Sequence, residues 1–136
     1  MPEKVRGCKF SPRGLRLNAI VQREVLTVLI ADDQREVIAV VADWLRRAGH
    51  VPIGATSGRE ATALLKSMHV DAVITDLVMP NGNGIELIMD VRATHPDMRI
   101  IAISSAEQAA AAQAAGATSC LRKPLSPEAV LSALKS

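Results

Sequence analysis

Polar and charged side chains follow directly after several short apolar runs of this chain. Asp32 and Asp33 close one such run, Asp76 closes a second, and Ser104 and Lys123 follow two more. If these runs are parallel strands of one sheet, all of these side chains lie along the same edge of that sheet. Carboxylates, a hydroxyl and an ammonium group gathered in one cleft suit a divalent cation and a phosphoryl group.

The acidic residues call for a cation, because carboxylates held close together repel one another. Magnesium is the natural candidate, since it takes hard oxygen ligands and readily shares its shell with phosphate oxygens. A carboxylate can also attack a phosphoryl group to give an aspartyl-phosphate. Asp76 is best placed to do so, at the end of the central predicted strand. Lys123 could then pair with one phosphoryl oxygen, and Ser104 could donate a hydrogen bond to another.

Each of these residues has an ordinary structural explanation when it is considered alone. A single Asp is usually a solvated loop residue or a helix cap, Ser104 could cap a helix, and Lys123 could be an exposed charge. Their joint placement at adjoining strand ends is what favours a functional site.

The spacing of apolar residues predicts alternating strands and helices from residue 25 onward. Continuous apolar runs are typical of strands buried on both faces, and they predict strands at residues 25–31, 51–55, 70–75, 99–103 and 117–121. Helical spacing fills the segments between these strands and after the last one. Ser57 with Glu60 predicts a capping box, and Ser126 predicts a cap before Pro127. Residues 79–84 are predicted to form a Pro- and Gly-rich loop.

This order of elements predicts an α/β fold with a doubly wound, flavodoxin-like sheet of five parallel strands. In the strand order 2-1-3-4-5, strands one and three flank the point where the order reverses, and ligands bind in the crevice there. Asp32, Asp33 and Asp76 end those strands, so the predicted topology brings the acidic residues to the crevice.

Composition and charge argue against a nucleic-acid-binding protein. The chain has 136 residues, enough for one domain with a substantial core. Residues 1–26 carry six basic and two acidic side chains, whereas the rest carries ten basic and twelve acidic ones. The body is therefore mildly acidic, and no nucleic-acid partner is predicted. Phe10 and Trp44 are the only aromatic residues, which leaves no stacking surface for bases.

Residues 1–24 are predicted to be a basic and flexible extension, because Pro and Gly residues interrupt any regular period there. Residues 25–136 form the predicted folded domain. No apolar run reaches membrane-spanning length, and the N-terminus lacks a secretory signal, so we expect a cytoplasmic protein with no membrane partner. Cys8 and Cys120 make neither a disulfide framework nor a zinc site.

From about residue 25 to residue 136, the chain resembles the receiver domain of two-component response regulators. No single motif is decisive, but the ordered set at these separations is highly specific. The resemblance implies a phosphoacceptor signalling domain rather than an enzyme. Its reactions would be limited to its own phosphorylation from a donor and its own dephosphorylation. The residues that carry the resemblance are Asp32-Asp33, the run from Thr75 to Pro80 with Gly84, Ser104, and Lys123-Pro124.

The resemblance also implies a role for each residue of the site. Asp76 matches the phosphoryl acceptor, Ser104 the switch hydroxyl and Lys123 the invariant ammonium. The family binds Mg²⁺ at this site. Its protein ligands would be Asp33, Asp32 through a water molecule, Asp76, and the main-chain carbonyl of Val78.

The partners that the resemblance implies are proteins. A histidine kinase or a phosphotransfer protein would supply the phosphoryl group. The fourth helix, fifth strand and fifth helix would bind a downstream protein, or a second copy in a homodimer. The Lys123–Pro124 peptide bond is usually cis in this family. The family usually has Tyr or Phe three residues before the lysine, where this chain has Cys120.

Two other functions are compatible with parts of the sequence. A phosphatase of the haloacid-dehalogenase type, with an aspartyl nucleophile, needs a second Asp two residues after the nucleophile, where this chain has Val78. A receiver-fold binding module that acts without phosphorylation is favoured by Cys120 and by an Ala-rich fourth helix with few side chains to hold a partner. Retention of all of the site residues argues against such a module.

Overall fold

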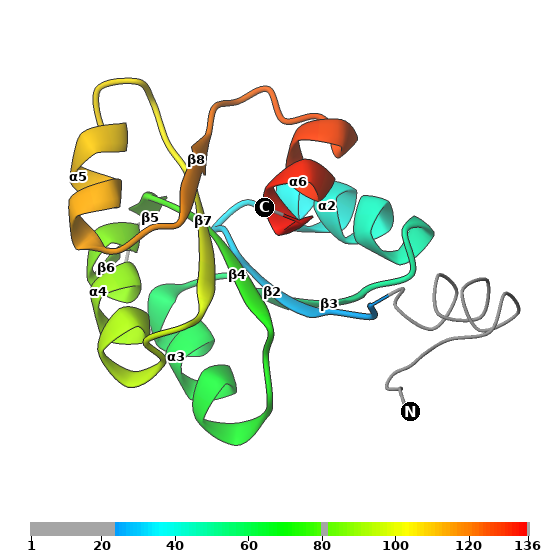
Figure 1. The fold of residues 1–136 in the computed structure, drawn as a ribbon, viewed down its shortest axis with the longest axis horizontal. Helices are drawn as coiled ribbons and strands as arrows, with labels where there is room; N and C mark the ends of the chain where they lie inside the picture. The colour runs from blue at the N-terminus through cyan, green and yellow to red at the C-terminus, as the bar shows by residue number, and fades with distance from the viewer. Residues whose placement is uncertain (1–23, 80–81, 136) are drawn as a thin grey trace, which may run out of the picture.

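The computed structural model describes residues 24–79 and 82–135. The predicted N-terminal extension therefore lies outside the described residues except for Glu24. The sheet has five strands, all parallel, in the order β3-β2-β4-β7-β8 (Figure 1). This is the order 2-1-3-4-5 along the chain, so the predicted doubly wound α/β fold is confirmed. The strands are β2 (Thr27–Ala31), β3 (Val51–Ala55), β4 (Ala72–Asp76), β7 (Arg99–Ile103) and β8 (Ser119–Leu121).

Helices cover both faces of this sheet (Figure 1). They are α2 (Arg35–Arg47), α3 (Gly58–Ser67), α4 (Gly84–Thr94), α5 (Ala109–Ala115) and α6 (Pro127–Lys135). α2 and α6 pack on one face, and α3, α4 and α5 pack on the other. Val28 and Ile30 of β2 join the first core, whereas Leu29 between them joins the second. Burial on both faces explains why the strands read as continuous apolar runs.

The helix caps predicted from the sequence form, with one difference in detail. Ser57 Oγ accepts a hydrogen bond from the main-chain N–H of Glu60 at 3.1 Å. The Glu60 carboxylate accepts the N–H of Thr56 at 2.7 Å, so the reciprocal bond lies one residue before the N-cap. Ser126 caps α6 through its hydroxyl, and Pro127 is the first residue of that helix. These caps satisfy main-chain N–H groups at the helix starts.

The segment after β4 is more regular than the predicted loop. β5 (Val78–Met79) and β6 (Gly82–Asn83) pair as an antiparallel ribbon, and α4 begins at the next residue. Each strand of the ribbon contributes only two residues, too few for an apolar pattern to reveal it. A Cβ at Gly84 would overlap the carbonyl oxygen of Asp76 and lie 2.7 Å from Cα of Leu77. Glycine here lets α4 pack closely against the chain that follows Asp76.

Arg92 ties the carboxyl end of α4 to the carboxyl end of α5. Its Nε and Nη2 donate to the carbonyl oxygen of Gly116 at 3.1 and 2.7 Å. Its Nη1 donates to the carbonyl oxygen of Pro96 at 2.6 Å. Gly116 follows α5 with a φ of 124°, in the region that favours glycine at the end of a helix. The end of α5 is therefore anchored to its neighbour.

Candidate functional site

The carboxylates of Asp32, Asp33 and Asp76 lie together at the carboxyl ends of β2 and β4. These strands are neighbours in the sheet, with Ala31 paired to Thr75. One oxygen from each of the three carboxylates lies within 4.8 Å of the other two. Asp32 is buried, Asp76 is half-buried and Asp33 is exposed. The predicted convergence of these acids at the strand ends is confirmed.

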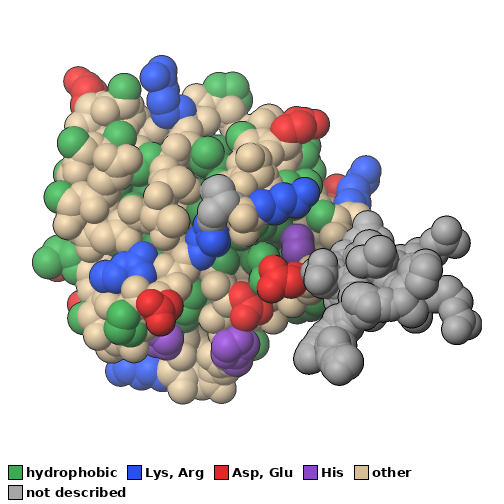
Figure 2. All heavy atoms as spheres, viewed as in Figure 1, with side chains coloured by type: hydrophobic (Ala, Val, Ile, Leu, Met, Phe, Trp, Pro, Cys, Tyr) green, Lys and Arg blue, Asp and Glu red, His purple; other side chains and the backbone are tan. Residues whose placement is uncertain are grey.

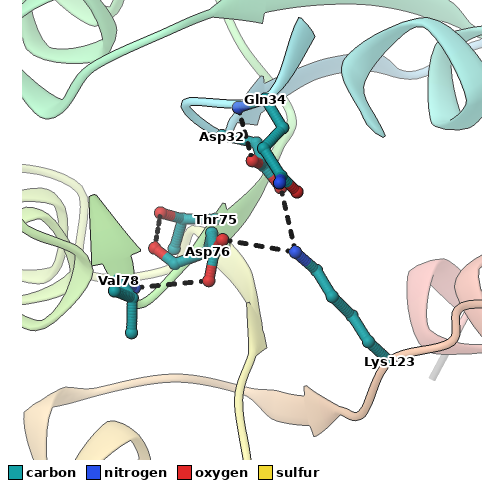
Figure 3. A network of polar contacts seen from close by, with 6 residues as sticks. All are labelled: Asp32, Gln34, Thr75, Asp76, Val78 and Lys123. Atoms are coloured by element: carbon teal, nitrogen blue, oxygen red, sulfur yellow. Dashed lines mark hydrogen bonds and ion pairs between the residues drawn. The ribbon is translucent and has the colours of Figure 1, made fainter. Parts of the chain in front are cut away.

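Lys123 reaches this cluster from the loop after β8. Its Nζ lies 3.4 Å from Oδ2 of Asp76 and 3.8 Å from Oδ2 of Asp32. Figure 3 shows its side chain directed toward both carboxylates. The Lys123–Pro124 peptide bond is cis, as the resemblance to the receiver family implied. One ammonium cannot neutralise three carboxylates, so the cluster keeps an excess of negative charge.

The environment of Asp32 shows that the cluster suits a cation. Burial raises the pKa of Asp32, and the charges of Asp76 and Asp33 raise it as well. The main-chain N–H of Gln34, which donates to Oδ1 at 2.9 Å, and the Lys123 ammonium act in the opposite direction. Oδ2 of Asp32 is buried and has no hydrogen-bond partner among the described residues. Such an oxygen, within a set of hard carboxylate ligands, fits Mg²⁺.

Main-chain and hydroxyl groups hold Asp76 in place. The N–H of Val78 donates to Oδ1 of Asp76 at 3.3 Å, and Thr75 Oγ1 donates to the Asp76 carbonyl oxygen at 2.9 Å (Figure 3). The main chain of Val78, whose carbonyl is predicted to bind the metal, therefore lies beside the acidic cluster. The Val78 side chain is 66% exposed and lines the pocket described next.

Ser104 follows β7 and lines an open pocket of about 460 Å³ together with Asp76 and Lys123. Its side chain is buried, and its Oγ has no hydrogen-bond partner among the described residues. The predicted gathering of these three residues is confirmed. Arg122 and Gln108 also line the pocket, and the sequence analysis missed both. Arg122 could have been found, because it follows a strand directly and precedes Lys123.

Cys120 lies in the core rather than in the pocket. It is half-buried in β8, where it packs with the residues between the sheet and α5. Its Sγ donates to the carbonyl oxygen of Ala109 at 3.7 Å. Cys120 is not among the residues that line the pocket beside Ser104. The thiol at this position therefore contacts the first turn of α5.

Known proteins share this fold and the order of these elements. The model of the response regulator receiver domain matches residues 28–135. The chain is 37% identical to chemotaxis protein CheY of Thermotoga maritima over 111 residues. The matched region covers 79% of this chain and 92% of that protein. This chain belongs to the response regulator receiver family. It is a signalling domain of the two-component type.

Solved structures agree with this assignment. The chemotaxis protein CheY4 of Vibrio cholerae superposes with a TM-score of 0.77 at 32% identity, over 82% of this chain and 98% of that chain. The beryllofluoride-activated NtrC4 receiver domain dimer superposes with a TM-score of 0.75 at 30% identity, over 80% of this chain and 93% of that one. Longer response regulators also match, and this chain spans 16% to 48% of their length.

Within residues 24–79 and 82–135, no helix has both the length and the apolar character needed to span a membrane. On the face that Figure 2 shows, basic, acidic and hydrophobic side chains are interspersed over the described residues.

Proposed function

We propose that Asp76 accepts a phosphoryl group in a magnesium-dependent step, and that a histidine kinase or a phosphotransfer protein supplies it. The observation that carries this proposal is the convergence of three groups on one pocket. They are the Asp76 carboxylate, the Lys123 ammonium 3.4 Å from it, and the Ser104 hydroxyl, which has no partner among the described residues.

The transfer itself needs little more than these groups. One oxygen of the Asp76 carboxylate forms a bond to phosphorus while the bond between phosphorus and the donor breaks, and the electron pair of that bond leaves with the donor. The Lys123 ammonium pairs with a phosphoryl oxygen as the group arrives. The Ser104 hydroxyl donates a hydrogen bond to another phosphoryl oxygen and so gains the partner that it lacks.

The acidic cluster would hold the metal. Asp33, Asp76 and the main-chain carbonyl of Val78 would contact Mg²⁺ directly, and Asp32 would act through a water molecule. Bound there, Mg²⁺ would offset the negative charge that the incoming phosphoryl group meets. Oδ2 of Asp32 is buried and accepts no hydrogen bond from the described residues, with only the Lys123 ammonium 3.8 Å away, and this supports the assignment.

Phosphorylation would change the surface made by α5, β8 and α6. Ser104 is joined to the start of α5 by only a few residues, so a shift of Ser104 toward the phosphoryl group moves that segment. We propose that this surface binds a downstream protein or a second copy of the chain. The NtrC4 neighbour, a receiver domain dimer, supports the homodimer. Hydrolysis of the aspartyl-phosphate would return the resting state, with no external substrate turned over.

We also propose that the protein is cytoplasmic and that its receiver domain comprises residues 25–136, after a basic N-terminal segment whose residues 1–23 lie outside the described part of the chain. The family match over residues 28–135 supports this division.

A second function is favoured by one observation. Cys120 takes the place of an aromatic residue, and α5 has only seven residues, six of them alanine. A receiver fold that binds a partner without phosphorylation would keep the acidic site and lose this coupling. The phosphatase alternative gains no support, because Val78 occupies the position of its general acid.

Intact-protein mass after incubation with acetyl phosphate and Mg²⁺ tests the main proposal. We expect one added phosphoryl group in the parent protein and none in Asp76→Asn, since the amide is a poor nucleophile. If the parent protein gains no phosphoryl group and also fails to bind beryllofluoride with Mg²⁺, the unphosphorylated binding module becomes the better description. Turnover of an external phosphate ester would instead revive the phosphatase.

A further inference from the structure

Arg122 is a second cationic residue in the pocket that holds Asp76, Ser104 and Lys123. Its side chain is exposed. Within the described residues, its guanidinium forms neither an ion pair nor a hydrogen bond with another side chain. The groups that line the pocket with it include Asp76 as the only acid. An unpaired guanidinium at the mouth of a site for phosphoryl transfer is available to an anionic ligand.

The backbone of β8 sets the position of Arg122. The N–H of Ser104 donates to the carbonyl oxygen of Leu121 at 2.9 Å, so Arg122 directly follows the residue that holds Ser104. Cys120 packs on the α5 side of the sheet and Leu121 on the α6 side. Arg122 is the first residue after β8, and it lines the pocket together with Ser105 and Ala106, which precede α5. Gln108, just before α5, lines the pocket there with it.

We infer that Arg122 contacts the leaving group of small acyl phosphate donors at this site, an inference that rests on the proposed phosphorylation of Asp76. Lys123 is paired with Asp76 at 3.4 Å and is placed to meet the phosphoryl group itself. Arg122 forms no ion pair with Asp76 within the described residues, so its donors are free for the other end of the donor molecule. Lys123 thus contacts the phosphoryl group of the donor, and Arg122 contacts its leaving group.

The chemistry of the donor decides how much this contact matters. With an acyl phosphate, an oxygen of Asp76 bonds to phosphorus, the bond from phosphorus to the bridging oxygen breaks, and the electron pair stays on the departing carboxylate. Negative charge grows on that carboxylate in the transition state, and the fork of N–H donors on Arg122 matches its geometry. Phosphoramidate reacts with its nitrogen protonated, so when the phosphorus–nitrogen bond breaks, the electron pair leaves on nitrogen as neutral ammonia. No negative charge grows on this leaving group, so a guanidinium helps less.

The test compares phosphorylation rates from acetyl phosphate and from phosphoramidate, measured by intact-protein mass with Mg²⁺. We expect the ratio of the first rate to the second to fall about threefold to tenfold in Arg122→Gln, an effect sized for an exposed and partly screened charge. Arg122→Lys restores part of the ratio, because the charge remains without the fork. Arg59→Gln, on the exposed surface of α3 outside the pocket, leaves the ratio unchanged.

An unchanged ratio in Arg122→Gln overturns this inference, whether the two rates stay constant or fall together. In that case an adduct on the parent protein leaves the proposed function standing. If neither donor modifies the parent protein, the proposed function fails and this inference fails with it. A second readout is ionic strength: added salt lowers the ratio in the parent protein toward that of Arg122→Gln.

Discussion

At the scale of single residues, Asp71 joins the beginnings of β2 and β4. Its Oδ2 accepts the N–H of Thr27 at 2.8 Å, and its own N–H donates to the carbonyl oxygen of Thr27 at 2.8 Å. His69 Nε2 lies 2.8 Å from its other oxygen. The hydrogen bond from Thr27, and next the contact with His69, hold the pKa of Asp71 below its ordinary value. The ionised carboxylate therefore stabilises the folded state.

The sign of this effect gives a prediction for acid unfolding. A lowered folded-state pKa contributes stability that is present above the unfolded value and is lost as the pH falls through the folded value. Asp71→Asn should lower the free energy of unfolding at neutral pH by about 1 to 2 kcal/mol, the contribution of a hydrogen bond to a charged group reduced for the partial exposure of Asp71. It should also flatten the decline of stability below about pH 5, in urea unfolding at several pH values.

Two residues serve as references for that measurement. Asp97→Asn, at an exposed position, should leave the acid dependence as it is in the parent protein. Asp32 works in the opposite direction, because its raised pKa contributes stability that is lost as the pH rises. An Asp71→Asn curve parallel to the parent curve would contradict the assignment.

The residues of the site could be predicted because the strand order alone decides which strand ends lie next to one another. Ligands gather at the carboxyl ends of parallel strands, and Asp32, Asp76 and Lys123 needed only that rule to be brought together. Asp71 could not be found in the same way, because it lies at the opposite ends of the strands and fell inside the segment predicted as the strand at residues 70–75, whereas β4 begins at Ala72. Arg122 was missed because one residue beyond a strand end can face either side of the sheet.

At the scale of elements, α4 depends on its first residue. Gly84 begins the helix where a Cβ would overlap main-chain atoms after Asp76. These are backbone atoms, so they cannot rotate away as a flexible side chain could. The start of α4 and the chain after Asp76 are therefore packed together, and we expect a change in the first to displace the second.

Gly84→Ala should lower the free energy of unfolding by about 1 to 3 kcal/mol, the usual cost of inserting a methyl group into a packed site. It should also slow phosphorylation of Asp76, since the chain beside the acceptor must shift. Urea unfolding and the mass assay measure the two effects. Gly58→Ala is the matched control, because a Cβ there meets nothing within 4 Å; its stability should equal or slightly exceed that of the parent. A stable and active Gly84→Ala protein would rule out this close packing.

The longer elements were predicted well, and the shorter ones less so. The strands at residues 51–55 and 99–103 have the predicted bounds, because each is mostly apolar and has clear turn residues around it, whereas β2 and β4 begin two residues later than predicted. β8 begins at Ser119 rather than at residue 117, because the pairing with β7 starts only there. The β5–β6 ribbon was read as loop, since its pairing depends on the turn and not on side-chain pattern.

At the scale of the whole molecule, the fold concentrates negative charge at one edge of the sheet. Two apolar cores hold the strands rigidly in register, so the carboxylates cannot move apart to relieve their repulsion. Repulsion among these carboxylates therefore destabilises the folded protein while no cation is bound. Anything that binds the folded cluster and not the unfolded chain should therefore stabilise the whole protein.

Magnesium should accordingly raise the melting temperature. At ten times its Kd, a ligand adds about 1.4 kcal/mol to the free energy of unfolding, which scanning fluorimetry across a Mg²⁺ titration can follow. Asp33→Ala should largely remove the response, because Asp33 is a proposed direct ligand. Asp90→Ala removes an exposed acid on α4 and should keep it. An unchanged magnesium response in Asp33→Ala would mean that the metal binds elsewhere.

The anchoring of α5 by Arg92 has a mechanical consequence. Two hydrogen bonds to Gly116 fix the carboxyl end of this helix, while its other end continues from the segment that holds Ser104. A helix held at one end is most free to move at its other end. If phosphorylation displaces the Ser104 segment as proposed, we expect α5 to rotate about its end at Gly116. Because α5 has only seven residues, a given displacement of its first residue would turn it through a larger angle than it would turn a longer helix.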